Sequence, residues 1–335
     1  MSKLANDTRV FKINPKIDVQ NVLFKNRYGF TLAGHLYLPI NFDVDKKYQT
    51  LVISGPFGAV KEQSSGLYAQ TFAERGFVTL AFDQSTTGES SGSVRNVASP
   101  DIFVEDFSAA VDFVGIQSFV DREKIGVIGI CGLGSHALTA ASIDKRIKAT
   151  ATSVMYDMSD SMWKGVGNTK TPNQRDLERD YLSVQRWKDA EVGASAMGPH
   201  ELTFDENDNP ITNVAILPDK LSEDADPITK AFFDYYKVRA FHPRSINSTG
   251  GWTATTPWSY YNFHLQEHID EISPRPVLIV TGENAHSRYM AEESYKSIKD
   301  HKELIVVPGA DHVDLYDQID KIPFDSFDHF FKENL

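Results

Sequence analysis

Residues 125–136 read IGVIGICGLGSH, an apolar run that leads into a group of glycines around Cys131. A short run of this kind is typical of a buried strand, and the glycines favour a sharp turn into the next element. Cys131 is the only cysteine among 335 residues. It is either a thiol presented for chemistry or a small buried hydrophobe in a tight turn, because most free cysteines are buried and inert. The rest of the chain has to decide between these two roles.

Strand and helix patterns alternate on both sides of this stretch. Residues 21–39 favour two strands joined at Tyr28-Gly29. Further strands are predicted at 48–54, 77–83, 124–130, 147–153, 276–282 and 303–309, with helices at about 65–75, after Ser99-Pro100, after Cys131, at 287–299 and near the C-terminal end. Short apolar strands separated by helices predict an α/β fold with a mostly parallel central sheet and helices on both faces.

The alternation stops in the middle of the chain. Residues 155–262 are polar, aromatic and irregular, with helices expected only near 174–188 and 227–238. We therefore predict a core formed by residues 1–154 and 263–335, and a helical and irregular cap formed by residues 155–262. In open α/β sheets, sites gather at the carboxyl ends of the strands, and the cap is expected to cover them.

Composition excludes several classes of function. The formal net charge is −12 and no Lys/Arg-rich run occurs, which argues against nucleic acid as a partner. No segment approaches about 18 uninterrupted apolar residues, and no signal-peptide pattern opens the sequence, so no membrane partner is expected. One cysteine cannot form an internal disulfide, which fits a reducing, cytoplasmic setting. Monomer and homo-oligomer both remain open.

Three chemically capable residues follow three predicted strands. Cys131 lies between a strand and a helix, Glu283 comes directly after VLIVTG, and His312 lies in the loop GADHVD after ELIVVPG. A cysteine at a helix N-terminus experiences a dipole that favours the thiolate. Nucleophile, acid and base in this chain order are the arrangement of the α/β-hydrolases.

Four segments carry a family resemblance that spans nearly the whole chain. They are GPFGAVKEQSSGLYAQTFAERGFVTLAFDQSTTGESSG (55–92), VGIQSFVDREKIGVIGICGLG (114–134), ISPRPVLIVTGENAHSRYMAEESYKS (272–297) and VVPGADHVDLYD (306–317). They resemble the dienelactone-hydrolase-like branch of the α/β-hydrolases, in particular the YcjY-like bacterial proteins. The resemblance implies the α/β-hydrolase fold and a Cys131, Glu283 and His312 triad.

Two positions depart from the pattern of that superfamily. The nucleophile turn G-x-nucleophile-x-G would have glycine where this chain has Leu133, and the usual acid position is Ala285. Glu283 is then a displaced substitute for the acid. Asp157, after the preceding strand, is the alternative acid.

The proposed triad assigns a separate catalytic role to each of its residues. His312 would take the proton of Cys131 or pair with its thiolate, and Glu283 would orient the imidazole. Backbone N–H groups of Gly132 and Phe57 would hold the oxyanion. Side chains expected to line the substrate pocket are His286, Trp252, Trp258 and Tyr260. No cofactor or metal is expected, since the acidic run DENDN (205–209) lacks the glycine and terminal glutamate of a calcium loop.

These residues predict a hydrolase for a small-molecule ester, lactone or thioester, with an acyl-cysteine intermediate. Leu133 and Ala285 favour an alternative, a catalytically weak binding protein of this fold whose Cys131 senses oxidants or electrophiles. A peptidase related to the prolyl peptidases would share the scaffold, although no pocket for an amino terminus is evident. A dehydrogenase is disfavoured because no G-x-G-x-x-G follows the first parallel strand.

Overall fold

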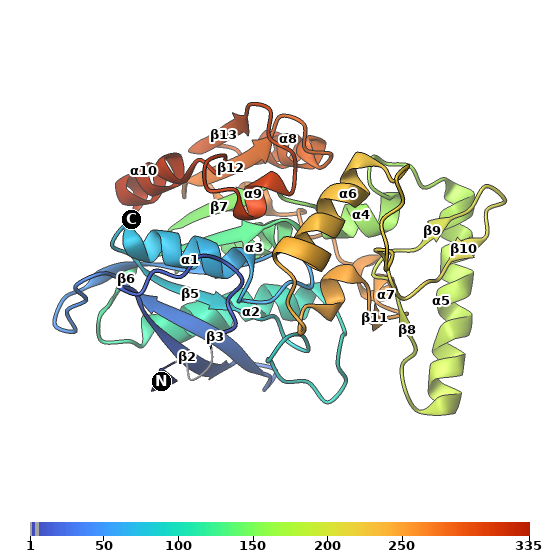
Figure 1. Ribbon diagram of the computed structural model, residues 1–335, viewed down its shortest axis with the longest axis horizontal. Coiled ribbons are helices and arrows are strands. Elements are labelled where there is room, and N and C mark those ends of the chain that lie inside the picture. Colours follow the sequence, from blue (N-terminus) through green and yellow to red (C-terminus); the bar gives the residue numbers. More distant parts are fainter. Residues whose placement is uncertain (1, 4–6) are drawn as a thin grey trace.

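The computed structural model describes residues 2–3 and 7–335. Its centre is a nine-stranded sheet with the order β1-β2-β3-β5-β4-β6-β7-β12-β13 (Figure 1). The strands are β1 (Ser2–Lys3), β2 (Asp18–Lys25), β3 (Thr31–Leu38), β4 (Tyr48–Ser54), β5 (Val78–Phe82), β6 (Val120–Ile130), β7 (Ala149–Ser153), β12 (Val277–Gly282) and β13 (Lys302–Val307). Neighbours from β5 to β13 pair in parallel, and β1, β2 and β3 add antiparallel pairings at one edge. The predicted α/β fold with a mostly parallel sheet is confirmed.

The predicted hairpin around Tyr28-Gly29 joins β2 and β3. Gly29 has φ +87°, a left-handed conformation that favours glycine. Asn26 closes the turn, because its side-chain oxygen accepts from the N–H groups of Tyr28 and Phe30 at 3.1 and 3.0 Å.

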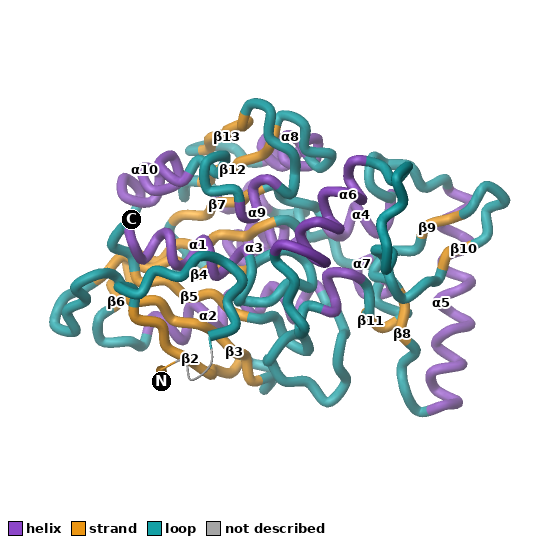
Figure 2. Tube along the Cα trace, viewed as in Figure 1, coloured by secondary structure: helices purple, strands orange, loops and turns teal. Residues whose placement is uncertain are grey.

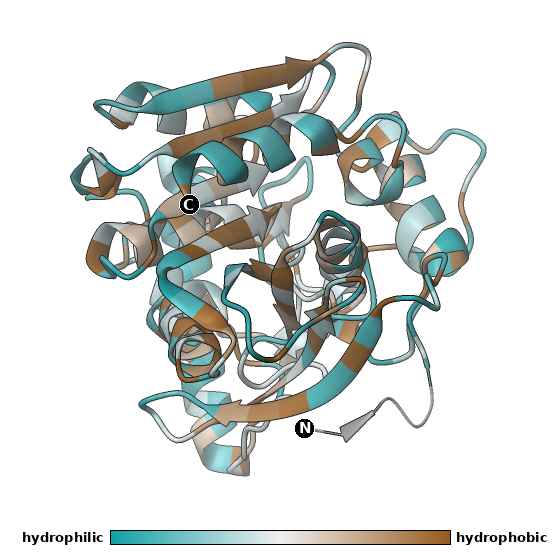
Figure 3. Cartoon of the chain, turned by 90° about the vertical axis from the view of Figure 1, so that its left-hand side faces the viewer, coloured by the Kyte–Doolittle hydropathy of each residue, from teal (hydrophilic) through white to brown (hydrophobic). Residues whose placement is uncertain are grey.

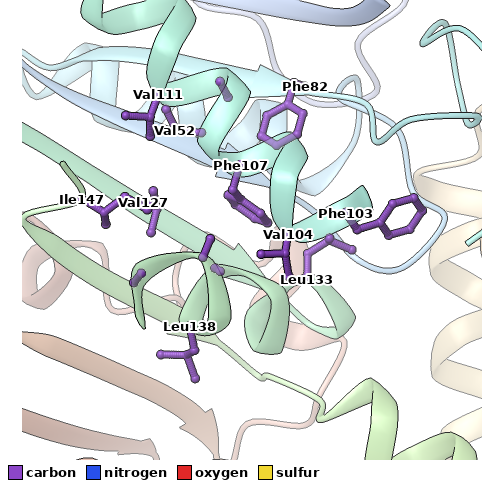
Figure 4. Close-up of a cluster of buried hydrophobic side chains, with 14 of the residues drawn as sticks. Val52, Phe82, Phe103, Val104, Phe107, Val111, Val127, Leu133, Leu138 and Ile147 are labelled. Carbon is purple, nitrogen blue, oxygen red and sulfur yellow. The ribbon is translucent and has the colours of Figure 1, made fainter. Parts of the chain in front are cut away.

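Helices cover both faces of the sheet. The bounds are α1 (Ser64–Glu74), α2 (Pro100–Gly115), α3 (Gly132–Ile143), α8 (Arg288–Ser297), α9 (Asp314–Asp317) and α10 (Phe324–Asn334). One buried cluster joins α2, α3 and α8 to the sheet (Figure 4), and a second joins α1 and α10 to it. Hydrophobic colour accordingly runs along the inner strands, between helices with polar outer faces (Figure 3). Buried on both faces, these strands read as continuous apolar runs.

Between β7 and β12 the described chain adds no strand to this sheet. It forms α4 (Met158–Lys164), α5 (Pro172–Val192), α6 (Pro227–Phe233), a π-helical turn η1 (Asp234–Arg239), the 3₁₀ turns η2 (Ile246–Thr249) and η3 (Ile269–Ile272), α7 (Pro257–Tyr260) and two short ribbons, β8 (Met197–Gly198) with β11 (Trp252–Thr253) and β9 (Thr203–Phe204) with β10 (Pro210–Ile211). Loops join these elements in one body beside the sheet (Figure 2).

The two helices predicted in the middle region are present as α5 and as α6 with η1. A capping box starts α5, where the Thr171 hydroxyl accepts from Gln174 N–H at 3.2 Å, and Gly193 ends it in a left-handed conformation. Across the described residues, none of the helices combines the length and apolarity that crossing a membrane requires.

Candidate active site

Cys131 sits on a strained turn between β6 and α3. Its φ of 54° and ψ of −126° are unusual for a residue with a side chain, and such backbone strain costs about 1–3 kcal/mol. The turn is tight because a Cβ on Gly129 would lie 2.4 Å from Leu133 O, and one on Gly134 would lie 2.5 Å from Met155 Cβ. Leu133 causes no such crowding, since its side chain packs among buried residues of α2 (Figure 4).

The Cys131 thiol lies beside both predicted oxyanion donors. Backbone N–H groups of Gly132 and Phe57, and the hydroxyl of Tyr316, are near enough to the sulfur to favour its thiolate form and to lower the pKa of Cys131. Burial nevertheless raises the pKa of Cys131 to about 11, because the low-polarity surroundings disfavour the thiolate more than these donors favour it. The thiol is therefore protonated at neutral pH.

His312 reaches Cys131 through the hydroxyl of Tyr316. The His312 ring is buried, and its Nε2 lies 3.0 Å from the Tyr316 oxygen, while its Nδ1 lies 2.8 Å from Ser287 Oγ. Burial, with a smaller contribution from His286, holds the pKa of His312 well below its ordinary value. The site therefore contains a neutral imidazole and a neutral thiol, bridged by a phenol.

The structure does not bring Glu283 to His312. The Glu283 carboxylate is exposed and accepts the N–H of Gly309 at 2.7 Å. Backbone bonds from Glu283 N–H to Val307 and from Asn284 N–H to Ala310 fix the chain at this point. The chain then turns inward, and Ser287 instead meets the imidazole. Position 285 adds no acid, because Ala285 packs in a buried hydrophobic cluster.

Asp157, the alternative acid, caps a helix. Its carboxylate accepts from the N–H groups of Ser159 and Asp160 at 3.0 and 3.1 Å, at the start of α4. Burial raises the pKa of Asp157 to about 6. These contacts serve the helix terminus and are not directed at His312.

A cavity of about 440 Å³ opens on Cys131. Its walls come from the first βα loop, from the turn after β6, from α9 and from the middle region of the chain. They are mostly apolar and include Phe57, Tyr156, Met158, Phe232 and Tyr236. A larger groove of about 810 Å³ lies against α1 and residues 319–325, and it does not include Cys131. The smaller cavity is the one that can hold a substrate for this thiol.

None of the four predicted pocket side chains lines this cavity. Trp252 is buried behind it, stacked on Phe57 with ring centroids 4.6 Å apart. The Tyr260 hydroxyl bonds His136 Nε2 at 3.1 Å.

The other two lie elsewhere. Trp258 is exposed, with Arg186 over its ring. The His286 ring packs against that of His312 at a tilt, with ring centroids 4.7 Å apart, and its Nε2 bonds the Tyr156 hydroxyl, so it supports the site from behind the cavity wall. Periodicity cannot distinguish a ring that lines a cavity from one that backs its wall.

Tyr316 and Ser287 were missed by sequence reasoning. Tyr316 lies in the short helix α9, four residues after His312, which lies in the turn that precedes this helix. A four-residue spacing brings two side chains to one side of a helical turn. That signal was available. Ser287 had none, because its approach to His312 depends on how the loop after β12 folds. The residues that the structure describes contain no cluster of three or more His, Cys, Asp or Glu side chains able to hold a metal ion.

Comparison with known proteins gives a consistent family. The model of the X-Pro dipeptidyl-peptidase (S15) family matches residues 29–314. The uncharacterized protein PA2218 of Pseudomonas aeruginosa is 52% identical, over 98% of this chain and 84% of its own. The uncharacterized protein YcjY of Escherichia coli is 31% identical, over 91% of this chain and 93% of its own. Thiohydrolase aneE of Aspergillus aculeatus is 34% identical, but over only 41% of this chain and 42% of its own.

Solved structures agree on the fold. The crystal structure of PA2218 matches with a TM-score of 0.90 at 50% identity, over 100% of both chains. The α/β hydrolase GrgF from Penicillium sp. sh18 matches with a TM-score of 0.75, over 94% of this chain and 98% of its own; at 20% identity this likeness shows the fold alone. The α/β-hydrolase fold is thus established, whereas membership of the dienelactone-hydrolase-like branch stays a prediction.

Proposed function

Because the chain belongs to the X-Pro dipeptidyl-peptidase (S15) family and has the α/β-hydrolase fold, we propose that it hydrolyses a carboxylic ester, lactone or thioester through an acyl intermediate on Cys131. One observation carries the proposal. The only thiol stands on a strained turn, between the N–H groups of Gly132 and Phe57, and borders a mostly apolar cavity. A packed structural cysteine needs none of these features.

Proton transfer in this site runs through Tyr316. In the Nδ1–H tautomer, His312 donates to Ser287 Oγ, and its Nε2 accepts from the Tyr316 hydroxyl. As the sulfur attacks the carbonyl carbon, the thiol proton passes to the Tyr316 oxygen, and the phenol proton passes to Nε2. The S–C bond forms, and the leaving oxygen or sulfur takes the proton back by the same route.

The N–H groups of Gly132 and Phe57 would stabilise the tetrahedral oxyanion. Both lie near enough to the Cys131 sulfur to lower its pKa, so a carbonyl oxygen on the carbon bonded to that sulfur would come within their reach. One such donor contributes ~3 kcal/mol in related sites. Water then attacks the acyl-cysteine with His312 as the base, the C–S bond breaks, and the thiol regains its proton.

Thioesters are favoured within the substrate class. The aneE relative is named a thiohydrolase. A thiolate leaving group also suits this site, because it needs less proton donation than an alkoxide does. No carboxylate among the described residues backs His312 to stabilise an imidazolium.

The hydroxyl of Ser287, in place of a carboxylate at His312, also supports a second candidate function. This candidate is a binding or electrophile-sensing protein of low turnover. A hydroxyl at Nδ1 orients the ring but carries no charge to stabilise the protonated form. In such a protein, Cys131 would be modified once by the electrophile and no product would be released. The raised pKa of the Cys131 thiol argues against a fast oxidant sensor, which needs a thiolate.

Steady-state hydrolysis distinguishes these possibilities. Butanoyl thioester, p-nitrophenyl butanoate and an X-Pro anilide would be offered to the wild-type protein and to Cys131→Ala. We expect turnover of the thioester and the ester, and a loss of roughly a thousandfold or more in kcat/KM for Cys131→Ala. Undiminished turnover in Cys131→Ala would exclude this nucleophile. One product per protein would identify the sensor, and anilide cleavage alone would identify a peptidase.

A further inference from the structure

The cavity beside Cys131 contains one carboxylate. Of the side chains that line it, Glu201 alone is acidic, and most of the wall is apolar. Glu201 comes from the middle region of the chain, just before β9, and faces the cavity while the core strands hold Cys131. A single ionisable group in an apolar cavity is the usual means of fixing a ligand's orientation.

Glu201 has no cationic partner of its own in the described structure. The Ser161 hydroxyl donates to Glu201 Oε2 at 3.2 Å. The buried ammonium of Lys170 is engaged by Glu178 at 2.8 Å and by the carbonyl of Met162 at 2.7 Å. Burial raises the pKa of Glu201 to about 7, although Lys170 opposes the rise. The Ser161 hydroxyl and a smaller contribution from the Val166 backbone leave acceptor capacity on this cavity-lining carboxyl group.

Tyr156 connects the carboxylate to the thiol. It lines the same cavity. Burial raises the pKa of the Tyr156 phenol well above its ordinary value, and the nearby Cys131 and Glu201 add to the rise. Tyr156, Cys131 and Glu201 therefore share one cavity and influence one another electrostatically. An acyl group attached to Cys131 can extend along Tyr156 toward Glu201.

Glu201 is half-buried where it lines the cavity, and a ligand that covers its carboxyl group without supplying a donor would leave that group unsatisfied at a cost in free energy. The inference rests on the proposed function and narrows its substrate. We propose that the acyl group of the substrate carries a hydrogen-bond-donating substituent, a hydroxyl or a protonated amine, whose hydrogen bond Glu201 accepts at the wall of the cavity that Cys131 also lines. An unsubstituted alkyl chain would leave the carboxyl group buried against methyl and methylene groups.

Binding to Cys131→Ala tests this inference without catalysis. Methyl esters of butanoic, hexanoic and octanoic acid would be compared by calorimetry with their ω-hydroxy and ω-ammonio forms. At the chain length that spans the cavity, we expect a donor-bearing ester to bind about tenfold tighter or better than its methyl-terminated counterpart. Preference for both donors indicates hydrogen bonding, and preference for the ammonium form alone indicates that charge is required.

Variants at Glu201 assign the preference to one side chain. In the Cys131→Ala background, Glu201→Gln should retain part of the preference, since an amide still accepts, and Glu201→Leu should abolish it. Glu206→Gln, the same substitution at an exposed residue of the same segment, should leave it unchanged. Equal binding of all forms at every length, or a preference that survives Glu201→Leu, overturns the inference.

Measuring acylation of the wild-type protein separates the test of Glu201 from the test of the proposed function. Wild-type protein that is acylated at Cys131 by a plain alkyl thioester supports the nucleophile, whatever Glu201 does. Binding selectivity in Cys131→Ala without acylation of the wild type supports Glu201 and rejects the nucleophile.

Discussion

At the scale of single residues, Cys131 is presented for attack and yet kept protonated. Burial raises the pKa of the thiol and lowers that of His312, so the resting pair is neutral. A thiolate–imidazolium pair, one of two possibilities considered from the sequence, is disfavoured by both shifts. Negative charge would develop only when the sulfur bonds to the carbonyl carbon, and it would then lie on the carbonyl oxygen, where the backbone N–H groups of Gly132 and Phe57 stabilise it.

The protonation state of the Cys131 thiol can be tested by the pH dependence of its alkylation rate. Cys131 should react slowly with iodoacetamide at neutral pH, and its rate should rise about tenfold per pH unit between about pH 8 and its pKa of about 11, because only the thiolate is nucleophilic. Mass spectrometry would follow the adduct. A rate that reaches its plateau below pH 7 would instead show a thiolate at rest.

Tyr316→Phe removes the hydroxyl that joins thiol and imidazole. Acylation should slow by about a hundredfold, the lower end for general acid–base assistance, while the ring keeps its packing. Stopped-flow release of p-nitrophenol would give the rate. Tyr289→Phe, whose hydroxyl accepts only the N–H of Gly167, is the matched control. Equal acylation rates in the two variants would remove Tyr316 from the mechanism.

Much of the site could be predicted from the sequence, up to the level of strand ends. Cys131 and His312 each follow an apolar strand, and parallel strands carry their ends to one edge. Glu283 follows a strand equally well, but its carboxylate points to Gly309. Its direction depends on backbone bonds of the loop, which no hydrophobic pattern encodes. Ser287 could not be predicted for the same reason.

At the scale of elements, the first βα loop is held by a buried ion cluster. The ammonium of Lys61 contacts Glu62 at 3.0 Å, Asp83 at 3.1 Å and Glu89 at 2.5 Å. Burial alone would lower the pKa of Lys61, but Asp83 and Glu62 hold it above its ordinary value. Asp83 also accepts the backbone N–H of Lys61 at 2.7 Å. The loop that carries the Phe57 N–H is thereby fixed to the end of β5.

Lys61→Met tests this cluster. The substitution leaves the buried carboxylate of Asp83 without its cation, while Glu62 and Glu89 keep Arg244, so the free energy of unfolding should fall by about 3–5 kcal/mol. Urea denaturation would measure the change. Lys46→Met removes an exposed lysine paired with Asp43 and should change stability by less than about 1 kcal/mol. Similar effects from both would show that the buried cluster contributes little.

At the scale of the whole molecule, core and middle region build the site together. Gln63 donates to the carbonyl of Ala240 at 2.8 Å, and the Ser64 N–H donates to the Tyr235 hydroxyl at 3.1 Å. Arg244 of the middle region pairs with Glu62 beside the same loop. The sheet was predictable because its strands are continuous apolar runs. The inner surface of the middle region was not, because irregular chain has no period that tells lining side chains from packed ones.

The central claim is a transient acyl-cysteine at Cys131. Intact mass would be recorded over time after mixing the protein with an activated acyl ester, for wild type, Cys131→Ala and His312→Ala. We expect the wild type to gain one acyl group and then lose it, Cys131→Ala to gain none, and His312→Ala to acylate slowly or to keep the adduct. No adduct on the wild type, or the same adduct on Cys131→Ala, would contradict this mechanism and would indicate that Cys131 is a packed structural residue of the turn.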